Sequence, residues 1–219
     1  MQNCYKTLND IALILDSTQE SIPIVKQLSP KDSPRAIGLD FGLNLGFAYA
    51  FTQVKSTPSA WYIFPQAIGV LNLDQSRYES GSTIFLRLRD LLNVVSPSII
   101  FYEDVKFTPS FDESVNVNIV VRRMAAPFEL LTALRQTCLL WAEDHNIPMF
   151  GISIGTIKKT ATGSGKANKF AVITACNEKF KTEFDPDTRG VDNAADAAFV
   201  LYAGLLQYGQ TLFPNQNQT

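Results

Sequence analysis

The chain has 219 residues, of which 46% are hydrophobic and 18% are charged, and its formal net charge is −2. These values fit one well-buried globular domain with a small appendage. They exclude a largely disordered chain and argue against a protein that binds nucleic acid by bulk charge alone. The three cysteines are widely spaced and the apolar stretches are too short to span a membrane, so we expect a cytoplasmic protein with no membrane partner.

The first part of the chain carries apolar side chains at helical spacing and leads into a stretch with prolines. We expect a helical extension over residues 1–34, a main domain over residues 35–210 and a flexible tail over residues 211–219. The extension carries no pattern that indicates chemistry. We therefore interpret it as an accessory for packing or dimerisation.

The main domain is expected to begin with two strands on either side of the turn Gly42-Leu43-Asn44. The first strand is a short apolar run that delivers one carboxylate, Asp40, just before the turn. A third strand falls within Trp61–Leu73, which is rich in aromatic and apolar residues, and the three strands form a meander. Asp40 is either a simple turn cap, since Asp and Gly are ordinary turn residues, or the first member of a site.

The middle of the chain predicts a helix, a buried strand and a long helix. Apolar residues recur at helical spacing from Tyr78 to Val95. The run Ser98–Val105 then has the composition of a buried strand, and it carries Glu103 near its carboxyl end. The long helix covers Val120–Glu143 and is either bent or entered at Pro127, because proline removes an internal hydrogen bond.

The remaining elements are a strand over residues 148–153, a turn of helix, a flexible loop around residues 163–165, and helices over residues 167–180 and 191–208. From Thr156 to Thr182 the chain is basic, with six lysines and a single acid. This segment stands out because the whole chain is slightly acidic.

Two acids of the last helix lie four residues apart. Asp192 and Asp196 therefore share one helical face, and Asn193 is also within reach. Together with Asp40 and Glu103 they make four carboxylates in an apolar setting, where mutual repulsion requires a bound divalent cation or a raised pKa. All-oxygen ligation favours Mg²⁺ or Mn²⁺ over Zn²⁺, and two such ions roughly 4 Å apart suit in-line attack of water on a phosphodiester.

Four motifs in this order resemble the RuvC family of Holliday-junction resolvases, and more closely its members from bacteriophages and mobile elements. The motifs are Gly38-Leu-Asp40-Phe-Gly42, Tyr102-Glu103, the lysine-rich stretch from Thr156 to Lys169, and Asp192-Asn-Ala-Ala-Asp196. The resemblance covers about residues 35–208. The lysine-rich stretch is its most discriminating part, since a strand that ends in an acid occurs in many ribonuclease H-like proteins.

This resemblance implies a ribonuclease H-like α/β fold, with a mixed five-stranded sheet of three antiparallel strands and then two parallel ones, flanked by helices. It also implies a homodimer that makes paired nicks in a four-way DNA junction. The implied cofactor is Mg²⁺, two ions per active site, with Mn²⁺ able to substitute. For a gene carried by a phage or plasmid, the expected location is the host cytoplasm.

The resemblance further implies that Asp40, Glu103 and Asp196 are metal ligands. The fourth acid of the family usually lies three residues before the last one, and this chain has Asn193 there. We therefore assign the fourth ligand to Asp192, four residues before Asp196, and leave the choice between Asp192 and Asn193 open.

Lys158 and Lys169 match the two functional lysines of the family, which are expected to hold the scissile phosphate. The expected substrate-binding set around them also includes Lys159, Lys166, Gly163, Gly165 and Phe107. For Lys159 and Lys166 an ordinary surface position is an equal alternative. Phe107 occupies the place of a family loop residue that wedges among unpaired bases, and a core position is its equal alternative.

Two other polar residues are left out of the expected site. Asp104 follows Glu103 directly, so its side chain should point to the opposite face of the sheet. His145 is the only histidine and falls at the end of a helix, where such a residue typically caps the helix or meets solvent.

Three alternatives to a junction endonuclease are considered. One is a non-catalytic junction-binding protein of the same fold, and another is a ribonuclease H-like nuclease that acts on RNA or on an RNA–DNA hybrid. A sugar-kinase or actin-like domain also opens with a Gly-x-Asp-x-Gly hairpin. Those proteins need two such domains and a later glycine-rich adenosine loop, which this sequence does not supply.

Overall fold

The structure is a computed structural model that describes residues 9–10, 35–51, 65–73, 82–105 and 117–212. Its sheet contains the strands β1 (Arg35–Asp40), β2 (Asn44–Phe51), β3 (Ala67–Asn72), β4 (Ile99–Asp104) and β5 (Met149–Ser153). The helices that pack around it are α2 (Ser82–Val95), α3 (Val117–Asp144), α4 (Ile154–Thr162), α5 (Lys169–Phe180) and α6 (Val191–Leu212). The expected helical extension, apart from residues 9–10, lies outside the described residues.

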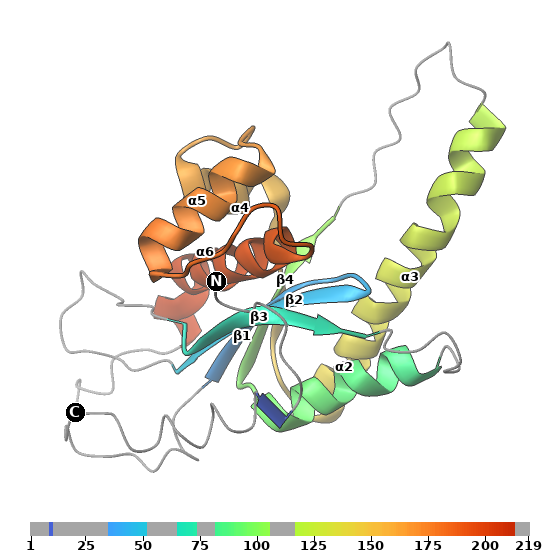
Figure 1. Cartoon of the computed structure of the whole chain (residues 1–219). Coiled ribbons are helices and arrows are strands. Elements are labelled where there is room, and N and C mark those ends of the chain that lie inside the picture. Colours follow the sequence, from blue (N-terminus) through green and yellow to red (C-terminus); the bar gives the residue numbers. More distant parts are fainter. Residues whose placement is uncertain (1–8, 11–34, 52–64, 74–81, 106–116, 213–219) are drawn as a thin grey trace, which may run out of the picture.

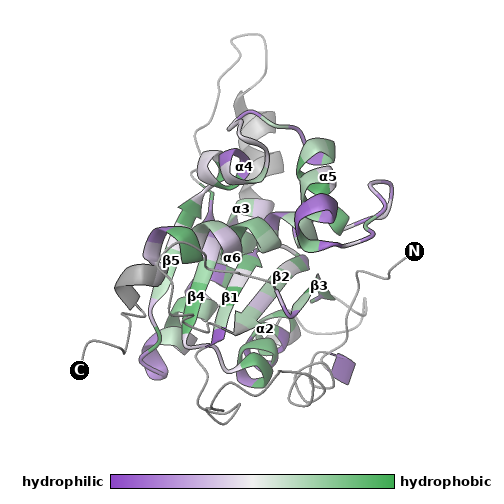
Figure 2. Cartoon of the chain, turned by 90° about the vertical axis from the view of Figure 1, so that its left-hand side faces the viewer, coloured by the Kyte–Doolittle hydropathy of each residue, from purple (hydrophilic) through white to green (hydrophobic). Residues whose placement is uncertain are grey.

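The five strands form one mixed sheet in the order β3-β2-β1-β4-β5. In Figure 2 this order runs from right to left. β1 pairs antiparallel with β2, and β2 pairs antiparallel with β3. β4 runs parallel to β1, and β5 runs parallel to β4. The predicted mixed sheet of three antiparallel and two parallel strands is therefore confirmed.

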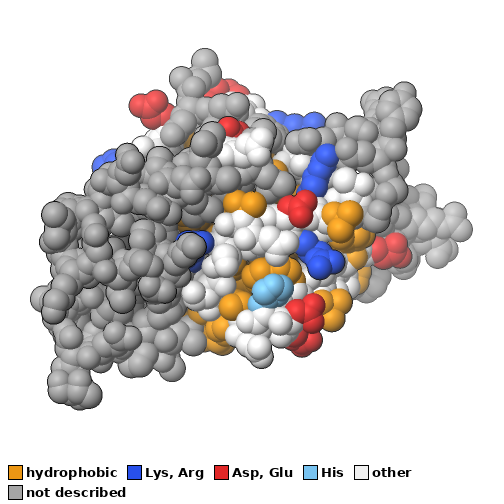
Figure 3. Space-filling view, turned by 90° about the horizontal axis from the view of Figure 1, so that it is seen from below, with side chains coloured by type: hydrophobic (Ala, Val, Ile, Leu, Met, Phe, Trp, Pro, Cys, Tyr) orange, Lys and Arg blue, Asp and Glu red, His pale blue; other side chains and the backbone are white. Residues whose placement is uncertain are grey.

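Helices cover both faces of the sheet (Figure 1). The helix α6 lies directly on one face, with α4 and α5 packed beyond it, and α2 and α3 lie on the other face. On that second side, seen from below in Figure 3, charges of both signs are interspersed with apolar side chains. Within the described ranges, no helix is long and apolar enough to cross a membrane.

The side chains of β1 alternate between two apolar cores, as the two-residue period of a strand requires. Ile37 and Leu39 belong to the core under α2 and α3, whereas Ala36 belongs to the core under α6. Gly38 faces α6 as well, and Asp40 follows it on the same face at the end of the strand. The alternation therefore places the carboxylate of Asp40 on the α6 side.

Two glycines allow α6 to approach the sheet at backbone distance. A Cβ atom added to Gly38 would lie 2.6 Å from the carbonyl oxygen of Ala197. A Cβ atom added to Gly46 would lie only 2.0 Å from the carbonyl oxygen of Asn193. No real side chain fits at either position without a shift of backbone, so these glycines set how close the helix lies to β1 and β2.

Several element boundaries differ from those expected. α3 begins at Val117 and runs through Pro127, so the helix is not entered at the proline. α6 continues to Leu212, beyond the expected end at Tyr208. β3 is shorter than the range Trp61–Leu73, of which residues 61–64 lie outside the described residues.

The two polar residues left out of the expected site lie away from it. The carboxylate of Asp104 lies 3.9 Å from a guanidinium nitrogen of Arg135 on α3, on the other face of the sheet. The ring of His145 stacks on the ring of Trp141 with centroids 4.1 Å apart, and its Nδ1 lies 2.8 Å from the carbonyl oxygen of Trp141. Both residues take part in the packing of α3.

We expect the substitution Gly46→Ala to lower the free energy of unfolding by about 3 kcal/mol, because the added methyl group must push α6 away from β2. Urea unfolding of the purified protein measures this change. Gly155→Ala is the matched control: a Cβ atom there meets nothing within 4 Å. Since alanine favours the helix, the control should be neutral or stabilising by up to about 1 kcal/mol. Equal stabilities of the two variants would contradict the packing argument.

Candidate active site

The first pair of carboxylates lies where β1 and β4 end side by side. Leu39 stands opposite Tyr102 in the parallel register, so the next residues, Asp40 and Glu103, are neighbours at the carboxyl edge of the sheet. Their side chains are hydrogen-bonded to each other. Two acids that are 63 positions apart in sequence are thus brought together by the pairing of their strands.

The second pair comes from the first turns of α6. Asp192 and Asp196 both lie close enough to Asp40 for their charges to act on it. The helix is held there by the close approach at Gly46 and by a hydrogen bond from the Nδ2 of Asn193 to the carbonyl oxygen of Asn44, 2.6 Å long. The four expected carboxylates therefore gather at one edge of the sheet.

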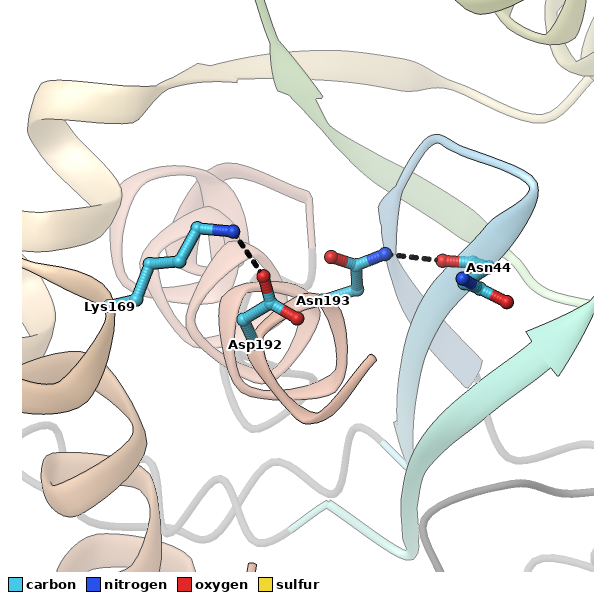
Figure 4. Close-up of polar contacts among 4 residues, drawn as sticks. All are labelled: Asn44, Lys169, Asp192 and Asn193. Carbon is cyan, nitrogen blue, oxygen red and sulfur yellow. Dashed lines mark hydrogen bonds and ion pairs between the residues drawn. The ribbon is translucent and has the colours of Figure 1, made fainter. Parts of the chain in front are cut away.

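Figure 4 shows that Asp192 and Asn193 reach toward different partners. Asn193 turns to the β2 backbone at Asn44, whereas Asp192 accepts a hydrogen bond from the ammonium group of Lys169. The side chain of Asn193 is thus engaged in fixing α6 on the sheet. Of the two candidates, Asp192 is the one whose charge acts on the carboxylate cluster, which supports it as the fourth ligand.

Burial and mutual repulsion disfavour the ionised form of the cluster. Burial, together with the hydrogen bond and charge of Glu103, raises the pKa of Asp40 well above its ordinary range, and the charges of Asp196 and Asp192 add to this. Burial also raises the pKa of Asp196 to about 7, with further contributions from Glu103 and Asp192. Asp40 and Asp196 therefore hold a proton more readily in the folded protein than in water.

Two lysines oppose that negative charge from α4 and α5. Lys158 and Lys169 each lower the pKa of Asp196 through their positive charges. Lys169 also donates a hydrogen bond to Asp192, which raises the pKa of the lysine. These are the two lysines that the sequence motif singled out.

Capping interactions fix the two short helices that carry these lysines. The hydroxyl of Ser153 accepts a hydrogen bond from the backbone of Thr156 at the start of α4, and Gly163 ends α4 with a φ of 80°. The side chain of Asn168 accepts a hydrogen bond of 2.9 Å from the backbone of Ala171 at the start of α5. The positive φ explains the glycine at position 163, since other residues adopt this conformation rarely.

Four of the five other expected substrate-binding residues lie on the surface of the described structure. Lys159, Lys166, Gly163 and Gly165 are all exposed on α4 and on the loop that joins it to α5. They belong to the same lysine-rich stretch as Lys158 and Lys169, but among the described residues they make no hydrogen bond or ion pair with the four acids. Phe107 lies outside the described residues.

Sequence reasoning missed the residues that seat α6 on the sheet. Neither Gly46 nor the backbone of Asn44 was expected to matter, yet they contact the residue between the two acids of α6. The signal was present in the sequence as a glycine inside an apolar strand, which often marks the close approach of another backbone.

The donor set fits a hard divalent cation. Four carboxylates supply only oxygen atoms, which Mg²⁺ and Mn²⁺ prefer, and a cation would relieve the repulsion that raises the pKa of Asp40 and Asp196. Among the described residues, no three acids, cysteines or histidines already stand in a metal-holding arrangement.

Comparison with solved structures shows that the chain has a ribonuclease H-like fold. The fold is that of RuvC: a Thermus thermophilus RuvC structure matches with a TM-score of 0.55 and 14% identity, over 79% of this chain and 96% of that one. T. thermophilus RuvC in complex with a Holliday-junction substrate matches with a TM-score of 0.55 and 17% identity, over 78% of this chain and 94% of that one. The predicted fold class is thereby confirmed.

The yeast mitochondrial Holliday junction resolvase Ydc2 also matches, with a TM-score of 0.47 and 14% identity, over 94% of this chain and 97% of that one. No family model and no curated protein sequence matches the chain. The two RuvC matches establish the fold, and the chemistry has to be argued from the site.

We expect the metal-free protein to lose stability as the pH rises from about 4 to about 7. The carboxyl group of Asp196 titrates near its ordinary 3.8 in the unfolded chain and near 7 in the folded one, so between these values the folded state binds more protons. Melting temperatures in EDTA at several pH values measure this trend.

Asp196→Asn should reduce the loss of stability with rising pH, because the amide does not ionise. Asp104→Asn is the matched control on the opposite face of the sheet, beside Arg135, and it should retain the slope of the unchanged protein. If the melting temperatures of all three proteins changed equally with pH, the pKa of Asp196 would not be raised in the folded protein.

Proposed function

We propose that the protein is a Mg²⁺-dependent endonuclease that cuts branched DNA, above all four-way junctions, by paired nicks. The observation that carries the proposal is the gathering of four carboxylates, opposed by two lysines, at the carboxyl edge of β1 and β4. This pattern is joined to a RuvC-like fold. A site of this composition suits phosphodiester hydrolysis, because carboxylates can hold metal ions and the lysines can offset the negative charge of the phosphate.

In this proposal the metal-holding residues are Asp40, Glu103, Asp192 and Asp196. Magnesium ions, when bound, would lower the pKa of the attacking water and place positive charge next to the phosphate. The carboxylates fix where the reaction takes place, because their positions depend on strand pairing and on the seat of α6.

The proposed task of Lys158 and Lys169 is to hold the scissile phosphate. In hydrolysis, an oxygen of water forms a bond to phosphorus, the bond from phosphorus to one sugar oxygen breaks, and that oxygen takes up a proton. Negative charge on the phosphate oxygens grows along the way, and an ammonium group close to them stabilises it. Lys169 is already directed into the site by its hydrogen bond to Asp192.

The proposed substrate rests on the fold and on charge. The T. thermophilus RuvC structure matched above contains a Holliday-junction substrate. In this chain, six lysines between residues 156 and 182 make the segment that carries Lys158 and Lys169 basic, in agreement with a polyanionic substrate. Paired nicks require two active sites, which a homodimer in the cytoplasm of the cell or phage host would supply.

We expect Asp40→Asn to abolish nicking of a synthetic four-way junction in Mg²⁺ while leaving junction binding largely intact. The amide keeps the size of the carboxylate but not its charge. Gel analysis of end-labelled junctions measures cleavage, and a mobility shift in EDTA measures binding. Cleavage by Asp40→Asn at the rate of the unchanged protein would refute the assignment of the metal site.

A panel of substrates tests the alternatives in the same assay. Four-way junction, flap, fork, linear duplex and RNA–DNA hybrid are compared in Mg²⁺, in Mn²⁺ and in EDTA. We expect the junction to be cut fastest, with Mn²⁺ able to replace Mg²⁺ and EDTA blocking the reaction. Preferential cutting of the hybrid would identify a ribonuclease, and tight junction binding without cleavage in either metal would identify a non-catalytic binding protein.

Lys169→Met should lower the rate of junction cleavage by about 100-fold, because one cationic partner of the phosphate is lost. Lys179→Met is the control at the other end of α5, where the ammonium group of Lys179 lies 4.0 Å from the ring centroid of Tyr202. Single-turnover rates at saturating enzyme separate this effect from weaker binding. A similar, small loss of cleavage rate in both variants would mean that Lys169 contributes only to the overall positive charge of α5.

A further inference from the structure

An aromatic side chain is exposed next to the lysine of the proposed site. Phe170 lies in the first turn of α5, directly after Lys169, and 63% of its surface is accessible to solvent. Exposing a large apolar side chain forgoes the stabilisation that burial would bring. The helix is seated on its neighbours through other residues, among them Val172, Ile173 and Phe180, so its packing does not depend on Phe170.

The position of Phe170 relative to the site is fixed. The hydrogen bond from Lys169 to Asp192 ties the first turn of α5 to the first turn of α6. The cap at Asn168 holds the same turn from the other side. Since consecutive Cα atoms are about 3.8 Å apart, Phe170 cannot move far from the carboxylate cluster without breaking one of these contacts.

The described residues include eight large hydrophobic side chains that are exposed, and four of them belong to segments that carry or adjoin the site. These four are Leu43 in the turn after Asp40, Val105 after β4, Ile154 at the start of α4, and Phe170. Exposed apolar side chains on the segments around a site are typical of a binding surface, and Lys169, directly before Phe170, indicates an anionic partner.

An aromatic ring among lysines is typical of surfaces that bind single-stranded nucleic acid, where the lysines contact phosphates and the ring stacks on a base. Of the four exposed apolar side chains, only Phe170 offers a flat ring. Inside a duplex both faces of a base are covered by its neighbours. The ring therefore suits a base that has lost a stacking neighbour, as happens at a branch point.

We propose that Phe170 stacks on an unpaired nucleobase of the DNA substrate, adjacent to the phosphate that Lys169 holds. This inference rests on the proposed function, since it requires branched DNA to bind at the carboxylate cluster. Phe170 is a specificity residue in this scheme: it favours substrates in which a base next to the scissile phosphate is free to leave the helical stack.

The test uses 2-aminopurine, a fluorescent base, placed singly at each of three positions on either side of the branch point of synthetic four-way junctions. The full-length protein carries Asp40→Asn, so that binding is observed without cleavage. We expect the fluorescence at one or more positions to change on binding as the base stacks on Phe170. Adding Phe170→Ala should remove this change, and Phe170→Trp should retain it.

Leu206→Ala is the matched control. Leu206 is also exposed and apolar, but it lies 14 residues beyond Asp192 on α6, about 20 Å along the helix. It should leave the fluorescence change intact. Without the Asp40 substitution, Phe170→Ala should slow junction cleavage at subsaturating DNA about tenfold, as the loss of one stacked base implies.

The outcomes separate this inference from the proposed function. An unchanged fluorescence response in Phe170→Ala, with junction binding intact, overturns the stacking role alone. A drop in oligomeric mass of Phe170→Ala on sedimentation, with an unchanged response, also overturns it, because Phe170 would then contact a second protein chain. Failure of the Asp40→Asn protein to bind the junction, together with failure of the unchanged protein to cut it, overturns the proposed function and this inference with it.

Discussion

The contact between the backbone of α6 and the glycines of β1 and β2 is the constraint on which the site depends. Gly38 and Gly46 bring the helix so close that its carbonyl oxygens occupy the space where side chains would otherwise be. Alanines along α6, such as Ala194, Ala197 and Ala198, allow the same approach from the other side. A bulkier residue on either surface would move the acids of α6 away from Asp40. The geometry of the site therefore depends on glycines and alanines that carry no functional group.

The close approach has an electrostatic cost. It places Asp192 and Asp196 beside two acids that are already in contact, in a region with little water, and the pKa values of Asp40 and Asp196 rise in response. Lys158 and Lys169 offset part of this charge. A cation bound there, as the proposed function requires, would relieve the repulsion that remains among the four acids.

Much of this arrangement was predictable from the sequence. Acids at the ends of apolar runs identify strand termini, and the i, i+4 spacing of Asp192 and Asp196 identifies a shared helical face; both are local patterns with a fixed geometry. The strand order and the RuvC-like fold were predictable through the order of the motifs. The different directions of the Asp192 and Asn193 side chains were not predictable, because they depend on the rotation of α6 relative to β2. That rotation is set by Gly46 and by the carbonyl of Asn44, about 150 positions earlier in the chain, and no local pattern reports it.

The order of the segments along the chain has a consequence for biosynthesis. During translation, Asp40 and Glu103 are made long before the acids of α6. The acids of α6 follow almost 90 residues after Glu103, and α6 must leave the ribosome and pack onto β1 and β2 before the cluster exists. A nascent chain therefore has half of the carboxylates but no assembled site. If the cluster cuts DNA, a growing polypeptide near the chromosome is harmless until its final helix is in position.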